Sequence, residues 1–355
     1  MPTVPPKGDR ATEVRGLVHT LQARYATGLA QVTRAWGHPD TLTPVTWSRD
    51  EGRHGGGRRL QAFDTPVFDR ASLNVSAVHY DDMPEKRLHT ATALSCIVHP
   101  RHPRAPSMHL HISWTALRTG NAYWRVMADL NPSHPHAGHT TRLLEAMQAT
   151  ADTAWSEGRD QGDRYFFIPA LQRTRGVAHF YLEGWNSGDW WADHHLAERF
   201  GISMIDTYCS ILESIAEGAS PPSETELDQQ RAYHSLYFLQ VLTLDRGTTS
   251  GLLVHGDNDV GILGSLPSTV DRAVLEGWLE VQPAPQEQLL RALIDTLPPG
   301  PTPTVDVATK RKLAQVVRDH YAEHPHALAL QARGNTIPPT VANHRNVEET
   351  RLQRG

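Results

Sequence analysis

The 355-residue sequence predicts an α+β fold, a large antiparallel β-sheet flanked by helices on both faces. Two features of the hydrophobic pattern carry this prediction. Between residues 55 and 139, short runs of two-residue period follow one another and are broken by Pro and Gly, which is typical of a meander of strands. Segments with a helical period are grouped before and after this region, whereas a doubly wound parallel sheet would alternate single strands with helices.

The individual elements follow from local periodicity. Apolar residues spaced by three and four predict a first helix over residues 12–36. The clearest strand covers residues 107–115, where alternation places three apolar side chains on one face and His109, His111 and Ser113 on the other. The other expected elements are a helix over 140–157, a strand near 177–182, helices over 190–217 and 224–231, and strands over 235–244 and near 260–266.

The chain is expected to end in a segment added to the main domain. After residue 297, the sequence PPGPTPT predicts a linker, followed by an amphipathic helix near 305–322 and a polar tail from about residue 333. We therefore expect one domain over residues 1–297 and an appended segment over 298–355.

Composition limits the class of partner. A formal net charge of −5 without a basic stripe argues against nucleic acid. No segment approaches the roughly 20 apolar residues that a membrane span needs, and the first ten residues lack the apolar core of a signal peptide. Cys96 and Cys209 are far apart, which fits a reducing compartment. We expect a cytoplasmic protein with a small-molecule substrate.

Several blocks of sequence, in order, resemble the oxygen-dependent coproporphyrinogen III oxidase family. They are a Gly run at residues 55–57, VFDRASLNVSAVH at 67–79, LSCIVHPRHPRAPSMHLHIS at 94–113, YWRVMADLNP at 123–132, DRYFFI at 163–168 and LDRGTTSGL at 244–252. The resemblance is strongest over residues 46–297. It implies oxidation by dioxygen, without an organic cofactor, in which propionate side chains on a pyrrole lose carbon dioxide and hydrogen. It also implies a homodimer, with residues 242–254 near the subunit contact.

The resemblance also implies roles for four residues. Asp129 matches an acid that faces pyrrole N–H groups, and His109 matches a histidine proposed as general acid or metal ligand, so both are candidate catalytic residues. Ser95 matches a substrate-contacting serine, and His99 matches a proposed metal ligand.

Other positions depart from the family pattern. His111 and Ser113 replace an Asn-x-Arg pair that suits propionate carboxylates, although Arg175 is retained. The family's triple glycine before Asp129 is replaced by residues 125–127. A Gly-Gly-Arg loop aligns with residues 255–259, which adds Asp257 and Asp259. We expect Ser95, His111, Ser113, Arg175 and Asp257 to contact the substrate, which should carry less negative charge than coproporphyrinogen.

A metal site is a further hypothesis. His109 and His111 stand at i and i+2 on one strand face, His99 comes from a neighbouring segment, and His139 lies where the family places another proposed ligand. Imidazoles of this kind suit copper, iron, manganese or zinc. The alternative is compositional drift, because the chain contains 21 histidines.

Three functions are consistent with these observations. The leading one is a dioxygen-dependent oxidase or oxidative decarboxylase that acts on a smaller or less anionic electron-rich substrate. The second is an authentic coproporphyrinogen III oxidase of haem biosynthesis, in which Arg118, Arg125 or Arg175 binds the carboxylates. The third is a non-catalytic tetrapyrrole- or partner-binding relic. A lipase-type hydrolase is excluded because the HGGG sequence at 54–57 has no G-x-S-x-G partner.

Overall fold

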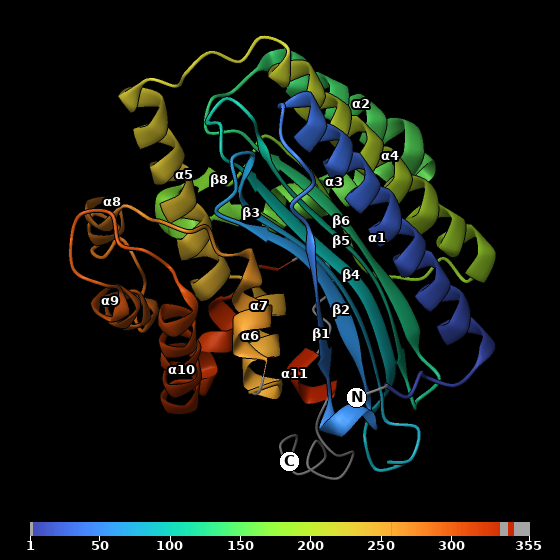
Figure 1. Cartoon of the computed structure of the whole chain (residues 1–355). Helices are drawn as coiled ribbons and strands as arrows, with labels where there is room; N and C mark the ends of the chain where they lie inside the picture. Colours follow the sequence, from blue (N-terminus) through green and yellow to red (C-terminus); the bar gives the residue numbers. More distant parts are fainter. Residues whose placement is uncertain (1–2, 257, 334–339, 344–355) are drawn as a thin grey trace.

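A single antiparallel sheet forms the centre of the computed structural model, which describes residues 3–256, 258–333 and 340–343 (Figure 1). The strand order is β1-β2-β3-β4-β5-β6-β9, and each neighbouring pair is antiparallel. The strands are β1 (Thr43–Ser48), β2 (Gly55–Phe63), β3 (Phe68–His79), β4 (Leu88–Pro100), β5 (Ser107–Leu117), β6 (Ala122–Asn131) and β9 (Ala178–Trp185). The predicted α+β class and the predicted meander are confirmed.

Helices cover both faces of this sheet, as predicted (Figure 1). One layer contains α1 (Asp9–Ala35), α2 (Ala137–Ala151) and α4 (Trp190–Ala216), while α3 (Trp155–Tyr165) packs along the edge strand β9. The second layer contains α5 (Glu224–Thr243), α6 (Arg246–Val254), α7 (Asp259–Ile262), α8 (Arg272–Glu276), α9 (Gln286–Thr296) and α10 (Val307–Glu323). We call the sheet surface under α1 and α4 the core face and the opposite surface the cavity face.

Strand β5 shows how the sequence alternation is used. Met108, Leu110 and Ile112 are fully buried in the large hydrophobic cluster of the core face. His109 and His111 point to the cavity face. Apolar burial therefore anchors the strand on one side and leaves the polar side chains of the other side available for a site.

Two predicted strands are wrong. Residues 235–244 form the second half of α5, and residues 260–266 form α7 and a 3₁₀ helix (Leu263–Ser265). Every residue of α5 from Tyr233 to Thr243 is buried, so its apolar residues show no helical stripe and resemble a buried strand. The signal for a helix was its start, where the side chains of Ser223 and Glu226 form a capping box.

The predicted helix over 140–157 is two helices, α2 and α3. Asp152, with a φ of 49°, separates them, and a left-handed residue cannot continue an α-helix. In the part of the chain that the structure describes, no helix is long and apolar enough to cross a membrane.

The segment after residue 297 packs on the rest of the chain. Leu313, Ala314, Val317 and Tyr321 of α10 belong to the same hydrophobic cluster as α5 and α9. The predicted polar tail falls largely outside the described residues, apart from the short helix α11 (Thr340–Asn343). A small hairpin is formed by β7 (Phe167–Ile168) and β8 (Arg173–Thr174).

Candidate active site

A cavity of about 320 Å³ lies between the cavity face of the sheet and the second helical layer. Cavities that bind small molecules usually measure about 300–1,000 Å³, so this one is at the lower end. Strands β3 to β6 and β9 form its floor, and α5, α6 and Ser265 form its roof. Asn343 of α11 lies in its wall, so the appended segment reaches the cavity.

The strand register arranges the floor as rows of side chains that run across the strands. His109 is paired with Asp129 of β6, and His111 is paired with Ser95 of β4. The three rows are Ile97–His109–Asp129–His179, Ser95–His111–Met127–Tyr181 and Ala93–Ser113–Arg125–Glu183. The candidate residues of the central strands are therefore brought together by pairing alone.

Asp129 lies beneath the cavity, between two residues that line it. Its side chain is completely buried, and its Oδ2 accepts hydrogen bonds from Arg175 Nη2 at 2.5 Å and from Asn131 Nδ2 at 2.7 Å. Its Oδ1 is 3.8 Å from His109 Nδ1. Burial lowers the pKa of His109, and Arg175 lowers it further, although Asp129 acts in the opposite direction. His109 is therefore neutral at pH 7 and suited to accept a proton.

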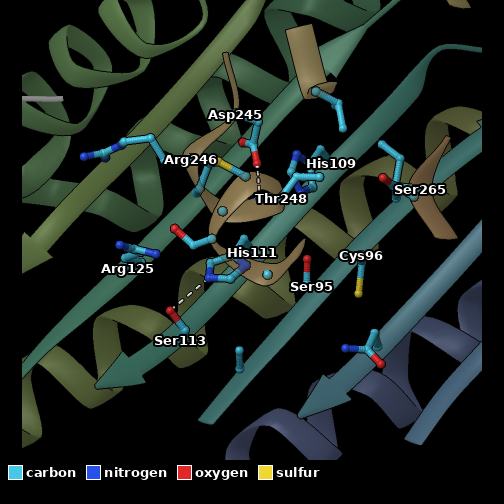
Figure 2. A pocket seen from close by; sticks show the side chains of 18 of the residues that line it. Ser95, Cys96, His109, His111, Ser113, Arg125, Asp245, Arg246, Thr248 and Ser265 are labelled. Carbon is cyan, nitrogen blue, oxygen red and sulfur yellow. Dashed lines mark hydrogen bonds between the residues drawn. The ribbon is translucent and has the colours of Figure 1, made fainter. Parts of the chain in front are cut away.

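His111 is held by its neighbour on the same strand face. Its Nε2 is 2.9 Å from Ser113 Oγ, and Figure 2 shows this contact at the edge of the cavity. Burial, together with Arg125 and His109, lowers the pKa of His111 to about 3. This imidazole is neutral at physiological pH and can donate or accept a hydrogen bond, but it cannot supply an acidic proton.

Two arginines meet one buried glutamate at the end of the cavity beyond Ser113. Arg246 Nη2 donates to Glu183 Oε1, which also accepts from Tyr181 Oη at 2.8 Å, and Arg125 Nη2 is 3.7 Å away. The Nε and Nη1 atoms of Arg246 are buried without a hydrogen-bond partner in the described part of the chain. Unused guanidinium donors of this kind suit a carboxylate.

The roof contributes a second acid, Asp245. It caps α6 by accepting from Thr248 N at 2.6 Å, as Figure 2 shows, and it accepts from Tyr165 Oη at 2.8 Å. Burial alone would raise the pKa of Asp245, but the hydrogen bonds and the nearby His109 lower it overall. His109 thus lies in the field of one carboxylate beneath it and another in the roof.

Comparison with known proteins assigns the chain to a family. The model of the coproporphyrinogen III oxidase family matches residues 13–294. The chain belongs to this family. It is 26% identical over 246 residues to the oxygen-dependent coproporphyrinogen-III oxidase of Rickettsia akari, a match that covers 65% of this chain and 85% of the relative. The enzyme of the same name from Prochlorococcus marinus strain AS9601 is 26% identical over 303 residues, covering 74% and 85%.

The mitochondrial enzyme of that name from Mus musculus is 27% identical over 286 residues, covering 74% of this chain and 63% of the relative. The chain is therefore a member of an oxidoreductase family, as expected, at low sequence identity. Such identity leaves room for a different substrate within the same fold.

The four histidines predicted as metal ligands are not brought together. His99 is fully buried outside the cavity wall, with Nδ1 2.9 Å from Ser107 Oγ and Nε2 3.1 Å from Ser265 O. His139 belongs to α2 on the core-face side, where it stacks on His136 with ring centroids 4.0 Å apart. Of these four, His109 and His111 line the cavity.

Most of the residues predicted to contact substrate do line the cavity. Ser95, His111, Ser113 and Arg175 are in its wall, and Asp257 lies outside the described residues. The neighbouring acid, Asp259, instead binds Arg318 of α10 through contacts of 2.7 and 2.8 Å. Of the arginines considered as replacements, Arg125 and Arg175 line the cavity, whereas Arg118 donates to Tyr80 O elsewhere.

Sequence reasoning missed the roof. Asp245 and Arg246 belong to the family block LDRGTTSGL, which we expected near a subunit contact, and the structure places them in the cavity wall. A weak signal was present, because Asp is a preferred residue at the N-cap of a helix, and Asp245 caps α6. Tyr165 belongs to the family block DRYFFI, but we did not predict a role for it, and Glu183 lies outside the family blocks.

Proposed function

We propose that this chain is a dioxygen-dependent oxidase that removes carbon dioxide and hydrogen from an electron-rich substrate smaller and less anionic than coproporphyrinogen. The observation that carries the proposal is the charge balance of the cavity. Each arginine in the described cavity wall already has an acidic partner: Asp129 for Arg175, and Glu183 for Arg125 and Arg246. Such a wall offers little net positive charge to a substrate with four carboxylates.

The floor of the cavity supports a smaller substrate. Where the family block has a run of glycines, β6 has Arg125 and Met127, and both side chains line the cavity. Glycines would leave that floor without side chains, so these replacements occupy space that a large ring system would need. The small cavity volume agrees with this interpretation.

A single carboxylate is the feature that the remaining donors can recognise. Arg246, which lines the same cavity as Ser113 and His111, has two guanidinium nitrogens, Nε and Nη1, without a partner among the described residues. We infer that they hold one carboxylate of the substrate, while Arg175 is committed to Asp129. One anionic group at one end of the cavity also fixes which part of the substrate reaches His109.

His109 is the proposed proton acceptor. For a propionate side chain, the balance is R–CH2–CH2–COO⁻ + O2 + H⁺ → R–CH=CH2 + CO2 + H2O2. The substrate loses two electrons to dioxygen, one C–H proton leaves, and the electron pair of the C–C bond to the carboxylate forms the double bond. Neutral His109 takes the leaving proton, and Asp129 stabilises the imidazolium that results, so Asp129 is a positioning residue.

The predicted metal ligands do not fit one metal centre. Both ring nitrogens of His99 are in contact with oxygen atoms of Ser107 and Ser265, and His139 lies behind the sheet. The remaining pair, His109 and His111, is too small a ligand set for a defined centre. No step of the proposed reaction therefore uses a metal.

Oxygen uptake with two substrates tests the proposal. The protein is incubated aerobically with coproporphyrinogen III and, separately, with an alkylpyrrole that carries one propionate, and dioxygen, carbon dioxide and peroxide are measured. Turnover of the monopropionate alone supports the proposal. Efficient formation of protoporphyrinogen would instead establish the authentic family activity, and tight binding without dioxygen uptake would establish a non-catalytic binding protein.

The homodimer stays a proposal based on family membership. Leu242 and Leu252 are buried within the chain, so the expected contact segment offers only part of its surface to another subunit. Size-exclusion chromatography with light scattering measures the mass directly, and a mass of one chain would contradict a dimer.

A further inference from the structure

A second group of ligand-type side chains lies at the start of α4, on the core-face side of the sheet (Figure 1). It consists of His194, His195 and Glu198. Their ligand atoms all lie within 4.8 Å of one another, and among the described residues no other three His, Cys, Asp or Glu side chains come this close. Helix geometry explains the grouping, because Glu198 is four residues after His194 and three after His195, and side chains at both spacings are neighbours on a helix.

His194 is the unusual member of the group. Its side chain is 8% exposed, and neither ring nitrogen has a hydrogen-bond partner among the described residues. The rings of Trp124, Trp190 and Trp191 each lie with centroids 5.9 Å from its own. A buried polar group without a partner costs about 1–3 kcal/mol of stability. A ligand bound to the His194 imidazole would remove this cost.

The carboxylates of the same helix turn differ in what they bind. Asp193 accepts from Trp185 Nε1 at 2.7 Å and from Ser187 N at 3.0 Å, so it holds the chain before the helix. Glu198 makes no hydrogen bond or salt bridge within the residues that the structure describes. Glu198, the acid beside the two histidines, is therefore available to bind an ion.

We propose that His194, His195 and Glu198 bind a divalent transition-metal ion, Zn²⁺ or Cu²⁺. Imidazole nitrogen and carboxylate oxygen are the ligands these ions prefer. Bonds of about 2.0–2.1 Å bring tetrahedral ligands roughly 3.3 Å apart, so His195 and Glu198 move inward on binding. His195 is exposed and can do so. Water, or Glu13 of α1, whose charge already acts on His194, completes the coordination.

Copper titration followed by tryptophan fluorescence tests this site, because Cu²⁺ quenches nearby indoles and Trp190 and Trp191 are next to His194. The full chain is treated with chelator and titrated with Cu²⁺, and Zn²⁺ binding is measured by calorimetry. We expect one ion per chain. His195→Ala and Glu198→Gln should each weaken binding at least about tenfold, without loss of the folded state.

The double variant His136→Ala/His139→Ala is the matched control, since it removes a stacked pair of histidines that belongs to no group of three ligand-type side chains among the described residues. It should bind Cu²⁺ and Zn²⁺ as the unaltered chain does. Unchanged affinity in both His195→Ala and Glu198→Gln would overturn the proposal, as would loss of binding in the control. Oxygen uptake should be the same in all variants, because the group lies behind the sheet, so this test is independent of the proposed oxidase activity.

Discussion

The ion pair between Asp129 and Arg175 gives the sharpest prediction about the site. Both side chains are almost completely buried, at 0% and 2% exposed, and their atoms are 2.5 Å apart. Asp129→Asn leaves the guanidinium of Arg175 charged and without its partner in an apolar setting between the rings of Phe166 and Tyr237. Breaking one half of a buried ion pair costs about 3–5 kcal/mol, so we expect the free energy of unfolding to fall by that amount.

Urea unfolding followed by circular dichroism measures this loss, with Asp163→Asn as the control. Asp163 also forms a contact with a buried partner, His179, at 2.8 Å, but its side chain is 52% exposed. Exposed pairs contribute about 0–1 kcal/mol. Equal losses in the two variants would refute the claim that burial makes the Asp129 pair critical.

Two further measurements separate structure from catalysis. The double variant Asp129→Leu/Arg175→Met removes both charges, and we expect it to recover most of the lost stability. Asp129 raises the pKa of His109, so Asp129→Asn should lower that pKa. The acid limb of kcat/KM would then move to lower pH, while the maximal rate falls because the imidazolium loses its stabilising carboxylate. A shift to higher pH would contradict the proposed role of Asp129.

Four other substitutions test the remaining assignments. His109→Gln should reduce kcat about 10²–10⁴-fold without a comparable loss of stability, and oxygen uptake of the unaltered chain is the reference. Arg246→Met should raise KM about tenfold or more, because a charge-assisted hydrogen bond contributes about 1.5–3 kcal/mol; an unchanged KM would remove the carboxylate assignment. The pKa of His111 is lowered to about 3, so the native state loses stability as the pH falls from 6.5 towards 3. His111→Asn should reduce this dependence of the free energy of unfolding on pH, as measured by urea unfolding. Burial and nearby arginines lower the pKa of Lys310 from 10.5 to about 6, so the protein loses stability as the pH falls through that range. Lys310→Met removes the cost of burying this amine and should stabilise the protein by roughly 2–5 kcal/mol at pH 7.

The floor of the site was predictable because a half-buried strand repeats every two residues. On β5, three apolar residues alternate with His109, His111 and Ser113, and no other structure accounts for that pattern over the whole strand. Antiparallel pairing then brings Ser95 next to His111. These placements need only the period and the order of the strands.

The roof was not predictable in the same way. Its residues belong to α5 and α6, which follow all seven strands of the main sheet in the chain, and the second half of α5 is buried on all sides. The predicted metal set failed to assemble for a related reason. His99 shares a strand face with Ser95, but it is four residues further along, where α5 and Ser265 cover it. The two-residue period predicts which face of the sheet a side chain points to. Whether that side chain lines the cavity or is covered depends on the elements that pack over that part of the face.

Two departures from the family blocks, Arg125 and Met127, lie on the cavity face of β6. We therefore expect them to change substrate binding more than the fold. Arg125 and Met127 line the cavity, and Met127 also belongs to a small hydrophobic cluster with Tyr165, Phe166 and Tyr181. Val126 lies between them on the core face and is fully buried, where size is constrained by α4. Substitutions at cavity-lining positions can therefore change the contacts offered to a substrate while the core face stays packed. The proposed function requires this combination, in which the scaffold and the proposed proton acceptor His109 are retained while the proposed carboxylate contacts differ.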